Sequence, residues 1–272
     1  GIASLGIDHE GFLLAPEEGV PDMPPLDRIA FEKSGIAKAD VPLICQKYAP
    51  SMLAEIAIQA MRAGVTLVDR GESWDAASYE GRLHYRDKAG KLSLPLPRMA
   101  GPHQADNAAL AIAMLRHQHD IAIPESALAA AMEWTRWPAR MQRLSPGPLT
   151  DLLPKGTEIW LDGGHNADGG RAIAAHFANE PRHIHLITGM LANKDPTAII
   201  APLKDKLASI TVLPVPGHEH HGVKAFGQGA VASPDIATAL QSLDVDPTAQ
   251  IILIAGTLYI AGEVLRLNGE SP

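Results

Sequence analysis

The stretch EIWLDGGHNADGGRAIAAHFA, residues 158–178, contains the pattern that decides the fold. It begins with an apolar run, as in a buried strand, and from residue 168 its apolar residues recur at helical spacing. A polar, glycine-rich loop lies between the two. In open α/β sheets, ligands bind at such loops, beyond the carboxyl ends of the strands. The stretch therefore predicts a strand, a binding loop and a helix.

The same alternation continues to the end of the chain. After the strand at 158–162 and the helix at 168–178, strands are predicted at 183–189, 209–215 and 250–255, and helices at 196–207, 234–243 and 257–267. Strands that alternate with helices indicate a mainly parallel sheet covered by helices. We therefore expect the loops DGGHN, GMLANKD, PGHEHHG and GTLY to lie along one edge of that sheet.

The first half of the chain is less regular. It shows, in order, a strand-like apolar run from Ile2, a helix at 26–37, a strand at 41–46, a helix at 51–63, and strands at 65–69 and 82–86 with a hairpin turn at 88–90. Two helices follow, one at 105–116 and one that begins at Pro124. Because the pattern restarts around Trp137, we expect two domains, 1–135 and 136–272.

Composition excludes several classes of protein. The 272 residues are 46% hydrophobic, which is enough for two modest cores. A formal net charge of -8 without a sustained run of Lys or Arg argues against a nucleic-acid partner, because binding phosphates needs a basic face. Cys45 is the only cysteine, and no apolar run approaches the roughly 20 residues needed to cross a bilayer. We therefore expect a cytoplasmic protein without a membrane partner.

The loop at 161–170 carries three polar side chains suited to chemistry: Asp162, His165 and Asn166. Its glycines lack the G-x-G-x-x-G spacing, so a dinucleotide fingerprint is excluded. A carboxylate, an imidazole and an amide at one strand end could hold a ribose hydroxyl, a phosphate or a metal-bound water. The alternative is structural, an Asx-turn followed by a helix N-cap. The segment by itself leaves both interpretations open.

Two further candidates lie in the first 40 positions. His9, which follows an apolar run, could bind a hard cation shared with phosphate oxygens or could be an ordinary loop histidine. Lys33 follows Glu32 in a mostly apolar helix, and the two could form a solvated pair. A buried Lys33 could instead keep its amine neutral enough to react with carbon dioxide and become a carbamate ligand.

Three more segments carry polar groups. Asn107 in GPHQADNAALA could hydrogen-bond a base or cap its helix, and Arg140 in WPARMQRL could reach phosphates from the domain boundary. The segment GHEHHG carries His218, His220 and His221, which suggests zinc. It lacks the H-E-x-x-H spacing of metalloproteases, and three loop histidines without a second cluster are more often solvated.

The order of these segments is more specific than any one of them. The chain resembles the folylpolyglutamate synthase/dihydrofolate synthase family of the Mur-ligase superfamily through SLGIDHEGFL, IAFEKSGIAK, GPHQADNAALA, WPARMQRL, LDGGHNADGG, ITGMLANKD and IAGTLYIAGEVL. The resemblance implies an α/β protein, with the remaining half of a Mur-ligase central ATPase domain at 1–135 and a Rossmann-like carboxy-terminal domain at 136–272. It implies a monomeric ATP-dependent amide ligase, with ATP and Mg²⁺ as cofactors, that joins L-glutamate to a pteroate or folate carboxylate through an acyl phosphate.

The resemblance also implies roles for individual residues. Asn107, Arg140 and Asp162 match elements that contact ATP in the family. His9 matches a magnesium ligand, and Lys33 matches the lysine that is carboxylated and helps to organise the metal and phosphate site.

His165 matches the histidine of the D-x-x-HN element and would lie beside the reacting groups, with Thr257 and Tyr259 near the cleft between the domains. The largest departure from the family is that no G-x-x-x-x-G-K-[ST] phosphate loop occurs in the 272 residues. We therefore expect the chain to be the carboxy-terminal two-thirds of the ligase and to be inactive alone. A smaller departure is Ala139, where the family prefers Gly.

Three alternatives stay open at this stage. The parent protein could be another Mur-type ligase, which adds an amino acid to a different acceptor such as a cell-wall precursor. The chain could be a non-catalytic module that keeps the cleft as a binding surface. It could also be a zinc hydrolase built on GHEHHG.

Overall fold

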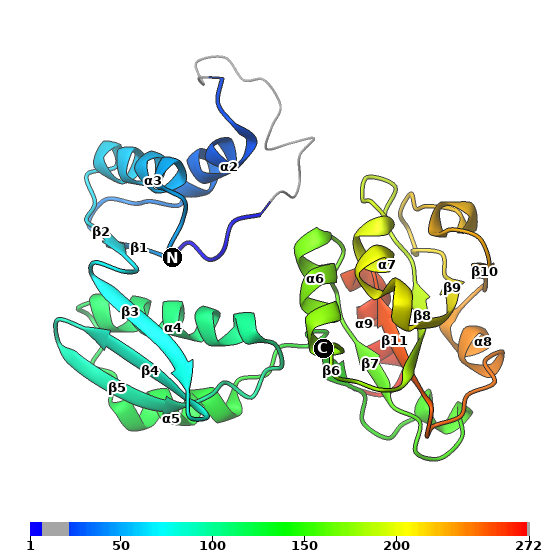
Figure 1. The fold of residues 1–272 in the computed structure, drawn as a ribbon. Helices are drawn as coiled ribbons and strands as arrows, with labels where there is room; N and C mark the ends of the chain where they lie inside the picture. The colour runs from blue at the N-terminus through cyan, green and yellow to red at the C-terminus, as the bar shows by residue number, and fades with distance from the viewer. Residues whose placement is uncertain (7–21, 271–272) are drawn as a thin grey trace. The chain divides into compact units, whose positions relative to one another are not determined.

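The structure is a computed structural model that describes residues 1–6 and 22–270. The chain forms two compact units (Figure 1). Unit 1 comprises Gly1–Arg98 and Pro102–Thr135, and unit 2 comprises Met99–Gly101 and Arg136–Pro272. Both combine helices with strands, so the expected α/β class is confirmed.

The first part of unit 1 is a small parallel layer. Its elements are the helices α2 (Pro25–Ser34) and α3 (Pro50–Arg62) and the strands β1 (Leu43–Cys45) and β2 (Leu67–Asp69). β1 and β2 pair in parallel, and Ile2 adds an isolated parallel bridge to Cys45. Ile2 packs into a core with Ala30 of α2 and Ile56 of α3. Among the described residues, the strand expected from Ile2 onwards is therefore limited to that single bridge.

The second part of unit 1 is an antiparallel sheet with two helices. Its elements are β3 (Trp74–Tyr79), β4 (Arg82–Asp87), β5 (Gly90–Pro95), α4 (Pro102–His117) and α5 (Glu125–Trp134). The expected turn at 88–90 joins β4 and β5. Side chains alternate along β4, so that Leu83 and Tyr85 enter a core shared with α4 and α5. The sequence does not predict β3, because Asp, Ala and Ser in its middle have low strand propensity and its pairing with β4 decides its conformation.

Unit 2 is built on a six-stranded sheet with the strand order β10-β9-β8-β11-β7-β6. The strands are β6 (Gln142–Arg143), β7 (Ile159–Leu161), β8 (His183–Thr188), β9 (Leu207–Val212), β10 (Val231–Ala232) and β11 (Gln250–Ala255). All neighbouring pairs are parallel except β6 with β7. The predicted parallel sheet is thereby confirmed, and β11, the last of these strands in the sequence, lies between β7 and β8.

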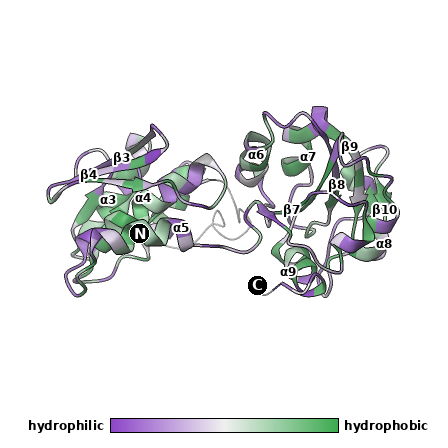
Figure 2. Ribbon diagram, turned by 90° about the horizontal axis from the view of Figure 1, so that it is seen from below, coloured by the Kyte–Doolittle hydropathy of each residue, from purple (hydrophilic) through white to green (hydrophobic). Residues whose placement is uncertain are grey.

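Helices cover both faces of this sheet. They are α6 (Ala167–His176), α7 (Thr197–Leu203), α8 (Ile236–Gln241) and α9 (Leu258–Leu267). α8 and α9 share a core with Ile252 and Ile254 of β11, whereas α6 and α7 share another with Ile251 and Leu253. β11 is therefore buried on both faces, and Figure 2 shows the hydrophobic colour on α9. No helix in the described part of the chain is both long and apolar enough to span a membrane.

Candidate functional site

Four loops lie at the carboxyl edge of the unit 2 sheet. β7, β8, β9 and β11 run parallel, so the loops DGGHN, GMLANKD, PGHEHHG and GTLY that follow them share this edge, as expected. The first and last of these loops touch, because a Cβ placed on Gly163 would collide with the side chain of Leu258. The candidate site is therefore built on the adjoining strands β7 and β11.

Asp162 lies directly after β7 and is only 8% exposed. Its Oδ1 accepts a hydrogen bond from the backbone amide of Gly164 at 2.6 Å, which closes an Asx-turn. Its Oδ2 accepts one from the backbone amide of Met141 at 2.8 Å. The carboxylate thus fixes the loop and joins it to the segment around Arg140. Its contact with ATP stays a prediction.

Asn166 and His165 of the same loop are also placed by contacts with the backbone. Asn166 is the N-cap of α6, and its Oδ1 accepts from the amide of Gly169 at 2.8 Å. The structural interpretation of this loop, an Asx-turn followed by an N-cap, is therefore confirmed. Nδ1 of His165 lies 3.1 Å from the carbonyl oxygen of Gly163. That contact requires the proton on Nδ1, so Nε2 of the neutral ring carries the lone pair.

Arg140 lies against this loop. Its Nη1 donates to the carbonyl oxygen of Ala139 at 3.3 Å and lies 2.9 Å from the position that a Cβ on Gly163 would take. Glycine at 163 therefore leaves room for the guanidinium. The residues on either side of Arg140 have left-handed backbone, with φ of +54° at Ala139 and +41° at Met141. The structure thus brings Arg140 to the loop that carries Asp162.

Thr257 and Tyr259 lie where β11 leads into α9. Thr257 is 5% exposed and caps α9, because its Oγ1 accepts from the amide of Tyr259 at 3.3 Å. Tyr259 is half exposed, and its ring lies on that of His218 with centroids 3.9 Å apart. His221 contacts the carbonyl oxygen of Lys194 through Nε2 at 2.6 Å. Among the described residues, no three His, Cys, Asp or Glu side chains gather to hold a metal ion, and nothing there supports zinc at GHEHHG.

Asn107 lies in the second turn of α4 and is exposed. Its Nδ2 donates to Oε1 of Gln104 at 3.3 Å. The helix begins at Pro102, earlier than the sequence predicts, so the interpretation of Asn107 as its cap is wrong. A contact between Asn107 and a nucleotide stays a prediction.

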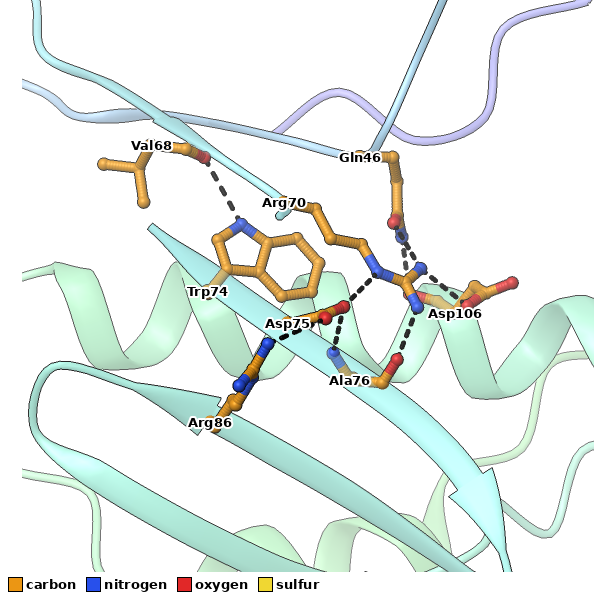
Figure 3. Close-up of polar contacts among 8 residues, drawn as sticks. All are labelled: Gln46, Val68, Arg70, Trp74, Asp75, Ala76, Arg86 and Asp106. Carbon is orange, nitrogen blue, oxygen red and sulfur yellow. Dashed lines mark hydrogen bonds and ion pairs between the residues drawn. The ribbon is translucent and has the colours of Figure 1, made fainter. Parts of the chain in front are cut away.

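A largely buried arginine that sequence reasoning missed holds the start of α4 (Figure 3). Arg70 follows β2, and its Nη1 donates to Oε1 of Gln46 at 2.9 Å and to Oδ1 of Asp106 at 2.7 Å. Its Nη2 donates to the carbonyl oxygen of Ala76 at 2.6 Å, and its Nε to Oδ1 of Asp75 at 3.3 Å. Gln46 in turn donates to the carbonyl oxygen of Asp106 at 2.7 Å. This cluster ties the carboxyl ends of β1 and β2 to the first turns of α4.

The charges in this cluster are set by its hydrogen bonds. Burial works to raise the pKa of Asp75, but hydrogen bonds from the amide of Ala76 and from Arg70 outweigh it and lower the pKa. Asp75 therefore stays ionised beside Arg70. The only trace of the cluster in the sequence is a charged residue, Arg70, one position after a strand-like apolar run.

Lys33 is exposed on the last turn of α2. The hypothesis of a buried lysine, kept neutral by desolvation, is therefore wrong. Its neighbour Glu32 pairs instead with Arg28, whose Nη2 lies 2.6 Å from Oε1 of Glu32. Carboxylation of Lys33 stays a prediction. His9, the expected magnesium ligand, lies outside the described residues.

Known proteins of one kind resemble this chain in sequence and fold. The folylpolyglutamate synthase of Lacticaseibacillus casei is 29% identical over 261 aligned positions, covering 89% of this chain and 58% of that protein. The solved structure of E. coli FolC in complex with DHPP and ADP matches with a TM-score of 0.76 and 23% identity, over 97% of this chain and 59% of that one. The bifunctional folylpolyglutamate synthase/dihydrofolate synthase from Yersinia pestis, complexed with AMPPNP and Mn ion, matches with a TM-score of 0.72 and 21% identity, over 90% and 58%.

The matches cover most of this chain but only part of its relatives. The chain spans about three-fifths of the length of these three proteins. No family model matches it. The similarity nevertheless includes both units, and over the matched part the fold is that of the E. coli FolC structure. The resemblance expected from the motifs is thus confirmed, because the relatives and structural neighbours of this chain are folylpolyglutamate synthases and dihydrofolate synthases of the Mur-ligase superfamily.

Proposed function

We propose that this chain is part of an ATP-dependent amide ligase that joins L-glutamate to a pteroate or folate carboxylate. The observation that carries the proposal is the arrangement of Arg140, Asp162 and His165 about one loop at the carboxyl edge of a parallel sheet. Two of the matching structures, from E. coli and Yersinia pestis, are complexes with ADP and with AMPPNP.

The reaction requires activation, because a carboxylate and an amine do not condense at neutral pH. Transfer of the γ-phosphoryl group of ATP to a carboxylate oxygen gives an acyl phosphate and ADP. The glutamate amine then attacks the acyl carbon, the bond from that carbon to the phosphate oxygen breaks, and inorganic phosphate leaves while the amine loses a proton. Most of the catalysis is then positioning and the offsetting of charge.

The described residues offer groups that suit these steps. Arg140 carries a planar, permanently charged guanidinium, which suits a transferred phosphoryl group. Asp162 holds the backbone beside it, and His165, on the same loop, is the imidazole that we place beside the reacting groups. In unit 1, Asn107 offers an exposed amide to the nucleotide, and Lys33 is the proposed site of carboxylation.

Magnesium enters the proposal through the family resemblance and through the Mn ion of the Yersinia pestis relative. The described residues hold no group of three metal ligands, and the proposed ligand His9 lies outside them. When bound, a divalent cation would offset charge on the phosphates of ATP. The roles of Arg140, Asp162 and Asn107 do not depend on it, whereas the role of a carboxylated Lys33 does.

The proposed partners are small molecules: ATP, L-glutamate and a pteroate or folate. We further propose that the protein acts as a cytoplasmic monomer, without nucleic acid or a membrane. Light scattering on the purified full-length protein tests the oligomeric state.

The test of the function is a ligation assay on the full-length protein with ATP, Mg²⁺ and L-glutamate, and with dihydropteroate or folate as acceptor. We expect ADP release and a product heavier by one glutamate residue in the mass spectrum. Arg140→Met should lower the rate about 100-fold, since it removes a charge that stabilises the transferred group. Arg143→Met is the matched control and should leave the rate unchanged, because Arg143 is exposed and pairs with Glu158.

Two outcomes would contradict the proposal. Product formed only with a UDP-linked peptide precursor would indicate another Mur-type ligase. A folded protein that releases no ADP with dihydropteroate, with folate or with that precursor would indicate a non-catalytic binding module.

A further inference from the structure

The backbone on both sides of Arg140 adopts a conformation that its residues disfavour. Ala139 and Met141 have φ of +54° and +41°, a region in which residues with a Cβ meet a steric penalty. Such a conformation persists only where surrounding contacts hold it. The contacts that hold the segment 139–141 therefore determine how Arg140 is presented.

Three hydrogen bonds hold this segment. The amide of Met141 donates to Oδ2 of Asp162 at 2.8 Å, and the carbonyl oxygen of Ala139 accepts from the amide of Gly163 at 2.9 Å. The amide of Ala139 donates to Oε1 of Gln142 at 3.0 Å. Two of the partners belong to the loop after β7. The third, Gln142, closes the turn from within the same segment of chain.

Gln142 is itself held by the residues after α9. Its Nε2 donates to Oε2 of Glu270 at 2.8 Å. The other carboxylate oxygen, Oε1 of Glu270, accepts from the amide of Ser145 at 2.9 Å and from Nδ2 of Asn268 at 2.8 Å. Asn268 is 3% exposed, and its Oδ1 accepts from the amide of Leu149 at 3.1 Å. Glu270 is therefore oriented by two other donors as well as by Gln142.

We propose that Gln142 and Glu270 are positioning residues that set the direction of Arg140, so that the chain after α9 controls how tightly the site binds a phosphate group. The inference rests on one part of the proposed function, namely that Arg140 contacts a phosphate group of the nucleotide. A glutamine suits position 142 because its amide accepts from Ala139 and donates to Glu270, and a carboxylate or an alkyl group cannot do both.

The donors and acceptors of this pair can be exchanged. Gln142→Glu keeps the size of the side chain and its bond from Ala139, but it places a second carboxylate, without a donor, against Glu270. Glu270→Gln leaves one oxygen to accept from Gln142, Ser145 and Asn268, so a contact is lost. In the double variant the carboxylate at 142 accepts from Ala139 and from the new amide at 270, whose oxygen accepts from Ser145 and Asn268. All the contacts are then restored.

The experiment is calorimetric titration of AMPPNP, which keeps three phosphate groups, with Mg²⁺ into the full-length protein and its variants. We expect Gln142→Glu and Glu270→Gln each to raise the Kd for AMPPNP about tenfold, and the double variant to return it to within about threefold of the parent value. Glu263→Gln is the matched control and should bind as the parent does, because Glu263 pairs with Arg266 on the exposed side of α9. Circular dichroism checks that each variant is folded, and Glu270→Gln, near the surface, carries the test if Gln142→Glu does not fold.

The outcomes separate this inference from the proposed function. Rescue by the double variant supports positioning, since general damage to the fold would add rather than cancel. Single variants that bind AMPPNP as the parent does, while Arg140→Met binds it weakly, would overturn the positioning role and leave the function intact. Weakened single variants without rescue would also overturn it. Unchanged binding of AMPPNP by Arg140→Met would remove Arg140 from the nucleotide site and overturn the positioning role, and the ligation assay alone would then decide the proposed function.

Discussion

Ala139 has a φ of +54°, a conformation that glycine adopts without a steric penalty. The family resemblance places glycine at this position, and the φ value explains that preference physically. The alanine side chain also stabilises the fold, because its methyl group is buried in the core formed with α8 and α9. At this residue, backbone strain and side-chain burial therefore oppose each other.

Ala139→Gly should change the free energy of unfolding of unit 2 by less than about 1 kcal/mol. Relief of the left-handed strain is worth about 1–2 kcal/mol, and it is offset by about 0.8 kcal/mol of lost methyl burial and roughly 0.5–1 kcal/mol of added chain entropy. Ala261→Gly is the matched control, because Ala261 lies in the same core but in the helix α9. It should cost about 2 kcal/mol, since it loses burial and helix propensity together. Urea unfolding of both variants measures these changes in the free energy of unfolding. If both variants lost the same free energy of unfolding, the strain at Ala139 would be contradicted.

Single residues of the site could be predicted where they follow a strand. Asp162 and His165 come directly after β7, and the apolar run marks that point in the sequence. The bond from the amide of Met141 to Asp162 could not be predicted, because it depends on how two segments fold together. The sequence left open whether Lys33 is solvated or buried, since an apolar helix does not reveal which of its polar residues face solvent, and the structure places Lys33 at the surface.

The helix α4 is held at its start by a side chain from another element. Arg70 reaches Asp106 and Gln46, and so connects β1 and β2 to the turns of α4 that carry Asn107 (Figure 3). A planar guanidinium can donate hydrogen bonds to these acceptors at the same time, whereas an ammonium on a flexible chain cannot match the same geometry.

Arg70→Met should lower the stability of unit 1 by about 2 kcal/mol, because it leaves Gln46 and the carbonyl oxygen of Ala76 without their donor. Arg70→Lys should recover less than half of the loss. Arg82→Met is the control and should cost under about 0.5 kcal/mol, because the side chain of Arg82 is exposed on the sheet and donates to Ser93. Thermal unfolding monitored by circular dichroism, with the transition of unit 1 compared among the three variants and the parent, distinguishes them.

The effect of Arg70→Met on stability should also depend on pH, in a direction that the pKa of Asp75 determines. The pKa of Asp75 in the folded protein is lowered from its ordinary value of 3.8, so its ionised form adds stability above that value. This stability is lost as the pH falls through the lowered pKa. The difference in stability between the parent and Arg70→Met should therefore shrink below about pH 4. A difference that stays constant from pH 7 to pH 3 would show that the charge of Asp75 plays no part.

At the scale of elements, the order of helices and strands in unit 2 could be predicted because their hydrophobic periods are distinct. The strands β6 and β10 have two residues each, which is too short for any period to appear. The position of β11 between β7 and β8 could not be predicted either, because the order of parallel strands depends on packing and not on local pattern.

At the scale of the whole molecule, the contacts divide the chain close to residue 135, although unit 2 also includes Met99–Gly101. The identification of unit 1 as part of an ATPase domain and of unit 2 as the Rossmann-like domain is part of the proposal.

The 272-residue chain alone should not release ADP from ATP with folate and L-glutamate. Its sequence contains no G-x-x-x-x-G-K-[ST] segment, so it lacks the backbone amides and the lysine that cradle the phosphates in such ligases. A coupled assay for ADP on the purified chain, beside the full-length protein, measures this. Turnover by the chain at a rate near that of the full-length protein would contradict the prediction.

The central place of β11 also determines when unit 2 can fold during synthesis. β11 pairs with β8 on one side and β7 on the other, yet it is made last of the three. A growing chain therefore exposes the apolar strands β7 and β8 until residues 250–255 have left the ribosome. Only then can both faces of the sheet close, so a chain whose synthesis stops before residue 250 would have a sheet that lacks its central strand and is open to chaperones and to aggregation.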